Sequence, residues 1–349
     1  MMMQKQQGFS LIEVFIALAV GLALLTGVLS VFVGMRTTTS ETSSYGEMQE
    51  NGRFAISVLT DDLFRQDYWG DLTKPMDIAV LRTNPAIPAV APDCNGEGIN
   101  NGSFPGAVGK FRTLWGDTVT TANMMGCITD AKIGSDVIQI KRVISSAEDL
   151  ANPLPDPVPA VGDSNRYYLI TDDNSGNIFR GNTTPANIRN SQVWQYQHHV
   201  YYIREEAQGS NVVPVLRQGR LTADNGMQFD VLVDGIEMIR FMYGVDTDAD
   251  GDTIDYFGGE GDGIVDAYIS ADNMTADLWD NRNSRILAVK MYVLVRDIMP
   301  DNKYENTNTY TLGDIDVNFI DGDGNGDNYR RLLFTSTVTL HNTRTDKWP

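Results

Sequence analysis

The feature that most constrains this chain is an uncharged stretch of twenty residues, Val14–Val33, close to its N-terminus. A helix of that length spans about 30 Å, which is the thickness of the hydrocarbon core of a bilayer. The stretch is too long for the apolar region of a cleaved signal peptide, and no small-residue cleavage site follows it. With Lys5 on the cytoplasmic side, the remaining chain is expected outside the cytoplasm. The simplest interpretation is a signal anchor.

A plain anchor leaves Glu13 unexplained. A carboxylate in a membrane helix costs roughly 2.5–3.5 kcal/mol at mid-bilayer and less near the interface, and such a residue usually has a partner. The run Gly8-Phe9-Ser10-Leu11-Ile12-Glu13 stands directly before the uncharged stretch. This run resembles the N-terminal signal of type IV pilins and pseudopilins, which combines a glycine, an aromatic residue, a glutamate and an apolar helix in this order.

The resemblance implies how the N-terminus is processed and used. A prepilin peptidase would remove a leader of residues 1–8 by cutting after Gly8, and the new N-terminal Phe9 would be methylated. Glu13 would become the fifth residue of the processed chain, and its implied partner is the N-terminal amine of a neighbouring subunit. Residues 9–35 would then span the membrane before assembly and pack in the filament core afterwards.

The pattern after the membrane segment predicts that the same helix continues as an amphipathic helix over residues 36–68. Apolar or small residues recur there at helical spacing; they are Tyr45, Met48, Gly52, Ile56, Leu59 and Leu63. The Thr- and Ser-rich stretch 37–44 is a weak helix former and is expected to be a hinge or a melted turn. The helix end, LTDDLFRQDYWG at residues 59–70, resembles that of PilW-type minor pilins.

The remaining residues, 69–349, predict a β-rich head. Strand-like runs separated by turn residues recur along it with no helical pattern between them, which favours an antiparallel meander. They lie at 137–143, 166–171, 193–204, 213–217, 229–233, 236–243, 286–296 and 331–341. The expected fold class is therefore α+β, a pilin-like long helix packed on an antiparallel sheet. His198 and His199 alternate along one strand and so face opposite sides, which argues against a shared metal.

The two cysteines, Cys94 and Cys127, fall in an irregular region, residues 70–160, that is rich in Pro, Asn and Gly. Disulfides persist outside the cytoplasm, so we expect these two residues to be bonded. Closing a loop of about 34 residues contributes roughly 3–4 kcal/mol in the chain-entropy model. A redox pair is the alternative, but the cysteines lack the C-x-x-C spacing of such pairs.

The first of two acidic loops, residues 246–280, opens with a calcium-loop pattern. Asp246, Asp248 and Asp250 precede Gly251, and carboxylates at positions 1, 3 and 5 with glycine at position 6 begin an EF-hand loop. Position 12 is Phe257 in place of the usual glutamate, so Asp266 is the expected later ligand. The stretch from Tyr243 also resembles an element of PilW-type proteins. A solvated acidic loop is the alternative.

The second acidic loop, residues 314–327, repeats the pattern. Asp321, Asp323 and Asn325 occupy positions 1, 3 and 5, and Asp327 follows a glycine. These four residues are a second candidate calcium site, and a plain hairpin turn is the alternative. Acids number 46 and bases 27, giving a net charge of −19. Such a surface repels phosphates, so no nucleic-acid partner is expected.

The sequence contains no Gly-x-Ser-x-Gly elbow, Walker loop or zinc-protease motif, so an enzyme is not expected. The resemblance to PilW-type minor pilins implies a structural subunit for type IV pilus assembly, in a priming complex at the pilus tip. Its implied partners are other minor pilins, the major pilin, a tip adhesin, the inner-membrane assembly platform and the prepilin peptidase. The alternatives are a J-type minor pseudopilin of a type II secretion system and a membrane-anchored calcium-dependent adhesin. Twitching motility, adhesion and DNA uptake are not separated by these motifs.

Overall fold

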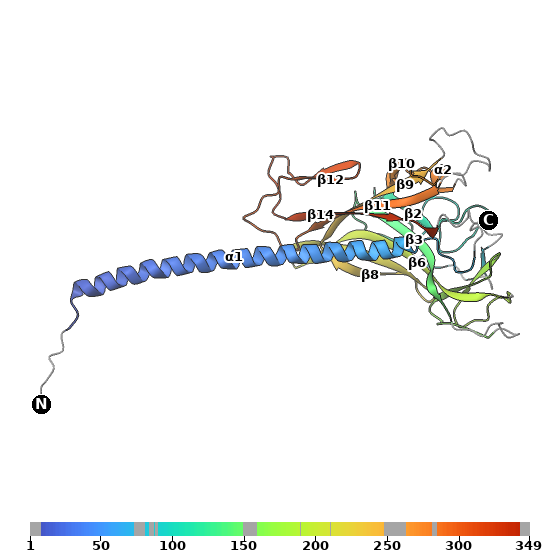
Figure 1. The fold of residues 1–349 in the computed structure, drawn as a ribbon, viewed down its shortest axis with the longest axis horizontal. Coiled ribbons are helices and arrows are strands. Elements are labelled where there is room, and N and C mark those ends of the chain that lie inside the picture. Colours follow the sequence, from blue (N-terminus) through green and yellow to red (C-terminus); the bar gives the residue numbers. More distant parts are fainter. Residues whose placement is uncertain are drawn as a thin grey trace, which may run out of the picture. The chain divides into compact units, whose positions relative to one another are not determined.

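A computed structural model describes residues 8–72, 81–83, 87, 90–148, 159–188, 190–209, 211–247, 263–280 and 285–342. The chain divides into two compact units, Met1–Gln49 and Glu50–Pro349. The predicted boundaries of the leader and of the two helical segments, at residues 8, 35 and 68, stay predictions. The α+β class is confirmed, because an N-terminal helix is followed by a head of mainly antiparallel sheet (Figure 1).

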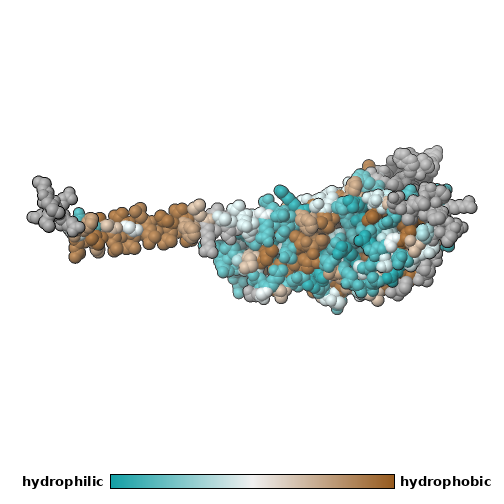
Figure 2. Space-filling view, turned by 90° about the horizontal axis from the view of Figure 1, so that it is seen from below, coloured by the Kyte–Doolittle hydropathy of each residue, from teal (hydrophilic) through white to brown (hydrophobic). Residues whose placement is uncertain are grey.

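Helix α1 (Leu11–Phe64) is continuous for 54 residues. Its first part, Leu11–Met35, is long and apolar enough to cross a membrane, and Figure 2 shows this part as an almost uniformly hydrophobic surface. The prediction of a melted turn at residues 37–44 is wrong, because helix α1 continues through this stretch unbroken. One hydroxyl there bonds within the helix: Thr39 Oγ1 donates to the Met35 carbonyl at 2.9 Å, which is compatible with a continuous helix.

An eight-stranded sheet forms the first part of the head. Its spatial order is β1 (Leu81–Thr83), β5 (Gly176–Arg180), β4 (Tyr167–Thr171), β6 (Gln192–Gln208), β3 (Asp136–Ala147) and β2 (Leu114–Thr118), with β7 (Asn211–Thr222) and β8 (Gly226–Asp234) continuing from β6. All pairings are antiparallel except that of β1 with β5.

The order of this sheet differs from the expected meander. Strand β6 pairs with β3 along one edge, and along the other it pairs first with β4, through Tyr167 and Tyr196, and then with β7 from His199 onward. At 17 residues, β6 is long enough to pair with two strands placed end to end. The meander is wrong because strands distant in sequence, such as β3 and β6, are neighbours.

A second sheet has four antiparallel strands in the order β10 (Ala267–Ser270), β9 (Ile236–Asp246), β11 (Arg285–Arg296) and β14 (Arg331–Thr339). A 3₁₀ turn, η1 (Ala271–Asn273), and a short helix, α2 (Ala276–Asp280), follow β10. A separate hairpin joins β12 (Thr309–Leu312) to β13 (Ile315–Asn318). Tyr310 and Val317 of this hairpin pack in one cluster with Leu294 and Leu333 of the second sheet.

The head end of α1 buries one face. Ala55, Leu59 and Leu63 recur every four residues and are fully buried, as amphipathic spacing requires. Gly52 lies against the ring of Phe334 in β14, and a Cβ at this glycine would lie 2.3 Å from the ring, so only glycine permits this approach. The predicted disulfide between Cys94 and Cys127 is confirmed.

Candidate functional site

The first turn of α1 contains a capping box. The Ser10 backbone N–H donates to Glu13 Oε2 at 2.9 Å, and the Glu13 N–H donates to Ser10 Oγ at 3.3 Å. Each side chain thus satisfies a backbone donor at the helix start, and the negative charge lies at the positive end of the helix dipole. Phe9, directly before this box, is 87% exposed. Gly8, Phe9 and Glu13 therefore lie together at an accessible helix terminus.

The capping box shows what Glu13 can do chemically. Its bond to Ser10 is local and exposed, and its donor is a neutral N–H group. A carboxylate bonds more strongly to an ammonium group than to a neutral amide. Glu13 can therefore replace its hydrogen bond from the Ser10 N–H with a bond to a cationic partner at little cost in free energy. The signature of this box, Ser-x-x-Glu before an apolar run, stands in the sequence at residues 10–13 but was not among the predicted features.

Two of the predicted calcium ligands lie where the first acidic loop leaves β9 and joins β10, which are neighbouring strands. Asp246, at the end of β9, is 1% exposed, and its Oδ2 accepts from the Gly263 N–H at 2.9 Å. Asp266, just before β10, accepts from the N–H and the hydroxyl of Thr247 at 2.7 and 3.0 Å. Asp248 and Asp250 lie outside the described residues. The other carboxylate oxygen of Asp246 is buried and has no hydrogen-bond partner within the described ranges.

The second acidic loop is held in a tight turn by Asp321. Its Oδ1 accepts from the N–H groups of Asp323 and Asn325 at 2.9 and 2.8 Å. These backbone bonds, led by that of Asn325, lower the pKa of Asp321 below its usual value. Among the residues that the structure describes, no group of three or more His, Cys, Asp or Glu side chains has the arrangement of a metal site. Calcium binding at either loop stays a prediction.

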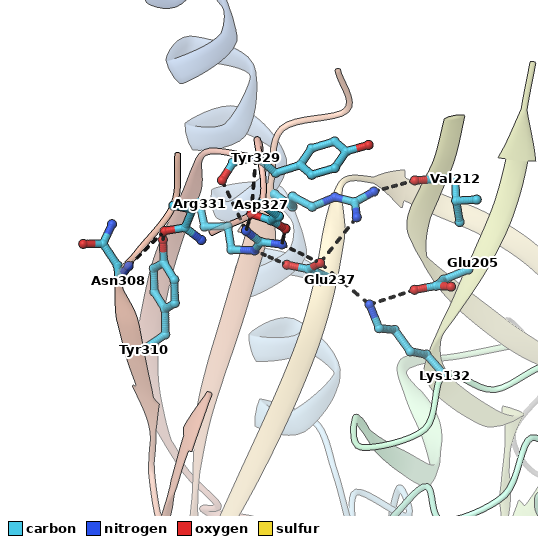
Figure 3. Close-up of polar contacts among 11 residues, drawn as sticks. Lys132, Glu205, Val212, Glu237, Asn308, Tyr310, Asp327, Tyr329 and Arg331 are labelled. Atoms are coloured by element: carbon cyan, nitrogen blue, oxygen red, sulfur yellow. Dashed lines mark hydrogen bonds and ion pairs between the residues drawn. The ribbon is translucent and has the colours of Figure 1, made fainter. Parts of the chain in front are cut away.

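Asp327, the last predicted ligand of this loop, is engaged by an arginine. Arg331 donates to its two carboxylate oxygens at 2.7 and 2.6 Å. Arg331 also bonds Glu237, which is 2% exposed, so that one guanidinium lies between two carboxylates (Figure 3). Lys132 and Arg296 approach the same Glu237 at 3.8 and 3.5 Å. This cluster ties the second acidic loop to strands β9 and β14.

A second buried ion cluster fixes α1 to the eight-stranded sheet. Asp62, 2% exposed, accepts from Arg142 Nε at 2.6 Å and from the Tyr201 hydroxyl at 2.8 Å, and its Oδ2 lies 2.7 Å from His199 Nδ1. Burial by itself raises the pKa of Asp62, but His199 and Arg142 outweigh burial and lower it below the usual range. Asp62 was not among the predicted site residues, although it lies three residues after the buried Leu59 and therefore on the same helical face.

The two adjacent histidines have different partners. His199 contacts Asp62, whereas His198 is fully buried between Ser103 Oγ, at 2.8 Å from its Nδ1, and Gln139 Nε2, at 2.7 Å from its Nε2. Burial lowers the pKa of His198 well below its usual value, so its ring is neutral. His198 is therefore engaged through both ring nitrogens, and His199 through its Nδ1.

Two comparisons with protein families bear on these sites. Residues 200–342 match the family model of type IV pilus-assembly protein W, PilW. Residues 3–29 match the prokaryotic N-terminal methylation motif. The resemblance to PilW-type pilins is confirmed. The PilW match runs from within β6 to the residues just after β14 and includes both acidic loops, whereas the methylation match includes Gly8, Phe9 and Glu13.

No curated protein and no solved structure shows significant similarity to the chain. The PilW and methylation matches together support a minor pilin that takes part in type IV pilus assembly. The apolar N-terminal helix and the methylation motif fit a membrane-anchored pilin.

Proposed function

We propose that this chain is a non-catalytic minor pilin that acts in a priming complex at the tip of a type IV pilus. The observation that carries the proposal is the joining of a methylation-motif segment to a PilW-type head in a single chain. Helix α1 begins within the methylation-motif match, residues 3–29, and continues without a break to Phe64. A head of this size, Glu50–Pro349, suits the tip better than close repetition along a thin shaft.

In this proposal, Leu11–Met35 anchors the subunit in the bacterial inner membrane with its head in the periplasm. Prepilin peptidase cuts after Gly8 and exposes the amine of Phe9 for methylation. During assembly the apolar segment enters the filament core, and Glu13 pairs with the N-terminal amine of a neighbouring subunit. The partners are the other minor pilins, the major pilin, the tip adhesin and the assembly platform.

A binding role also fits the buried polar groups of the head. The buried carboxylates of Asp62 and Glu237 bond arginines and thereby join elements of the head to one another. Such ion pairs specify geometry, since removing either partner leaves a buried uncompensated charge.

A chromosomal deletion tests this role. We expect the deletion strain to lose surface pili, counted after shearing, and to secrete its exoproteins normally. The same strain carrying the wild-type chain on a plasmid is the control and should regain pili. Normal pili with lost secretion would contradict the proposal and identify a J-type pseudopilin. An uncut Gly8–Phe9 bond in the membrane fraction would favour a membrane-anchored adhesin.

Calcium binding at the first acidic loop is a second proposal. The buried, unpartnered oxygen of Asp246 favours it, because a cation would satisfy that oxygen and relieve repulsion among the neighbouring acids. Isothermal titration of the full chain in detergent with Ca²⁺ should give heats that are lost in Asp246→Asn and kept in Asp316→Asn. Flat heats, with a melting temperature unchanged by EDTA, would reject calcium binding.

A further inference from the structure

Strand β14 has one paired edge. It pairs with β11 from Arg331 to Thr339 in a register without shifts. Across the part of the chain that the structure describes, no strand pairs with the outer edge of β14. A free edge presents a row of backbone N–H and C=O groups that can template another strand.

The ladder shows which residues present these groups. The Asp297 N–H donates to the Arg330 carbonyl at 2.9 Å, and the Leu340 N–H donates to the Leu287 carbonyl at 2.8 Å. Hydrogen-bonded positions alternate along an antiparallel pair, so the even-numbered residues of β14 point their backbone groups at β11. The odd-numbered residues Leu333, Thr335 and Thr337 therefore point theirs outward.

The sequence of this edge lacks the residues that usually protect exposed edges. Natural proteins blunt an exposed edge with charges or proline, among other devices. Residues 332–340, LLFTSTVTL, contain no charged residue and no proline in a chain that is 21% charged. An uncharged edge of this length is typical of a strand that pairs with another chain.

A groove of about 580 Å³ lies beside this edge. Two phenylalanines, Phe64 of α1 and Phe334 of β14, contribute to its lining, and Phe64 is 55% exposed. The full lining is Arg53, Ile56, Ser57, Thr60, Asp61, Phe64, Phe334, Thr335 and Ser336. A backbone edge next to a side-chain pocket is the arrangement by which β-augmentation sites bind extended peptides.

We propose that the outer edge of β14 accepts an extended strand from a different subunit of the same pilus, with one apolar side chain of that strand in the groove. The inference rests on the proposed pilin function and adds how the head binds its partner. Two copies of this chain, each with a net charge of −19, repel one another, which favours a neutral or basic donor segment over self-association.

Photo-crosslinking in cells tests the edge directly. The full chain carries p-benzoylphenylalanine in place of Thr337, an exposed residue of this edge, or in place of Asp316 on the β12–β13 hairpin as the control. We expect irradiation to link the Thr337 site to another pilus subunit, identified by mass spectrometry, and to give no such product from Asp316. A product with a second copy of this chain, or equal products from both sites, would overturn the proposal.

A matched pair of substitutions tests the backbone contact. Thr335→Pro removes one outward N–H and leaves the ladder to β11 intact, whereas Thr335→Val keeps that N–H and the β-branched shape. Recovery of the other minor pilins with the purified chain should fall about tenfold in the proline variant, the cost of one backbone hydrogen bond, and stay near wild type in the valine variant. Equal recovery from both variants would reject the edge contact.

A stability measurement keeps this test decisive. Thermal unfolding of Thr335→Pro should match that of Thr335→Val; if the proline variant unfolds, the crosslink at Thr337 decides. Failure of the proposed function is distinguishable from failure of the edge contact. A deletion strain with normal pili rejects the pilin role, whereas lost pili combined with absent crosslinks reject only the edge.

Discussion

Two of the carboxylates of helix α1 are in opposite situations, Glu13 in the apolar segment and Asp62 in the head. Glu13 is exposed and accepts one bond from the neighbouring Ser10 N–H. Asp62 is buried and has three partners from two strands of the eight-stranded sheet. A buried ion with all its bonds made cannot change partners without leaving a charge uncompensated, whereas an exposed local cap can. The same helix therefore holds one acid that stabilises the subunit and one that is available to a neighbour.

The largest effect is expected at Glu13. Glu13→Gln keeps the shape of the cap but removes the charge that would bind a neighbour's amine, so sheared surface pili should fall roughly tenfold or more. The unfolding midpoint of the head should not change. Glu47→Gln, an exposed acid farther along α1, is the control and should assemble normally. Normal piliation of the Glu13 variant would show that Glu13 does not pair with a neighbouring subunit.

The next effect is on stability. Asp62→Asn leaves Arg142 buried without a counter-charge and should lower the free energy of unfolding by about 3–5 kcal/mol. Its neighbour Asp61 forms an exposed i,i+4 pair with Arg65, so Asp61→Asn should cost only about 0.5 kcal/mol. Denaturant unfolding of the full chain in detergent measures both. Similar losses from the two variants would contradict the structural role of Asp62.

Lowering the pH should remove the contribution of Asp62 to the free energy of unfolding gradually. Because the pKa of Asp62 is lower in the folded chain than its ordinary value of 3.8, its contribution is complete well above pH 3.8 and is lost as the pH falls below it. Each unit of pKa lowering corresponds to about 1.4 kcal/mol. Unfolding free energies measured between pH 6 and pH 2 should therefore fall more steeply for wild type than for Asp62→Asn. Parallel curves would show that Asp62 does not titrate below its ordinary pKa.

The smallest effect is expected at Ser10. Ser10→Ala removes the hydroxyl that caps the helix start and should cost about 1 kcal/mol locally. Faster amide exchange confined to the first turn of α1 is the expected result. Pilus number should stay near wild type, because the Glu13 charge remains. Changes in exchange within the head would show that the capping box acts beyond its own turn.

The N-terminal part of the chain was largely predictable because its signals are contiguous. The apolar run and the helical spacing each lie within one segment, and the structure joins them as one helix. Most strands were located by the same local reasoning, as at residues 193–204 within β6. Their order was not, because the pairing of β3 with β6 depends on the length of β6 and on contacts across some 60 residues.

The candidate sites divide in the same way. The glycine, aromatic residue and glutamate of the N-terminal motif stand within six residues, and Cys94 and Cys127 have no other cysteine to pair with. The partners of Asp62 come from residues 142, 199 and 201, and Glu237 meets Arg331 from 94 positions away. No local sequence pattern predicts such long-range ion pairs and hydrogen bonds. The arginine that engages Asp327 is only four residues away, yet its second bond, to Glu237, is long-range.

In the proposed pilin, the Cys94–Cys127 bond marks when the head leaves the cytoplasm. Cytoplasmic reductants keep thiols reduced, so a lasting bridge forms only after that part of the chain has left the cytoplasm. The oxidation state of this pair therefore reports whether the head has left the cytoplasm. Alkylation of free thiols in cells would separate subunits still awaiting translocation from those whose heads have completed it, before any of them enters a filament.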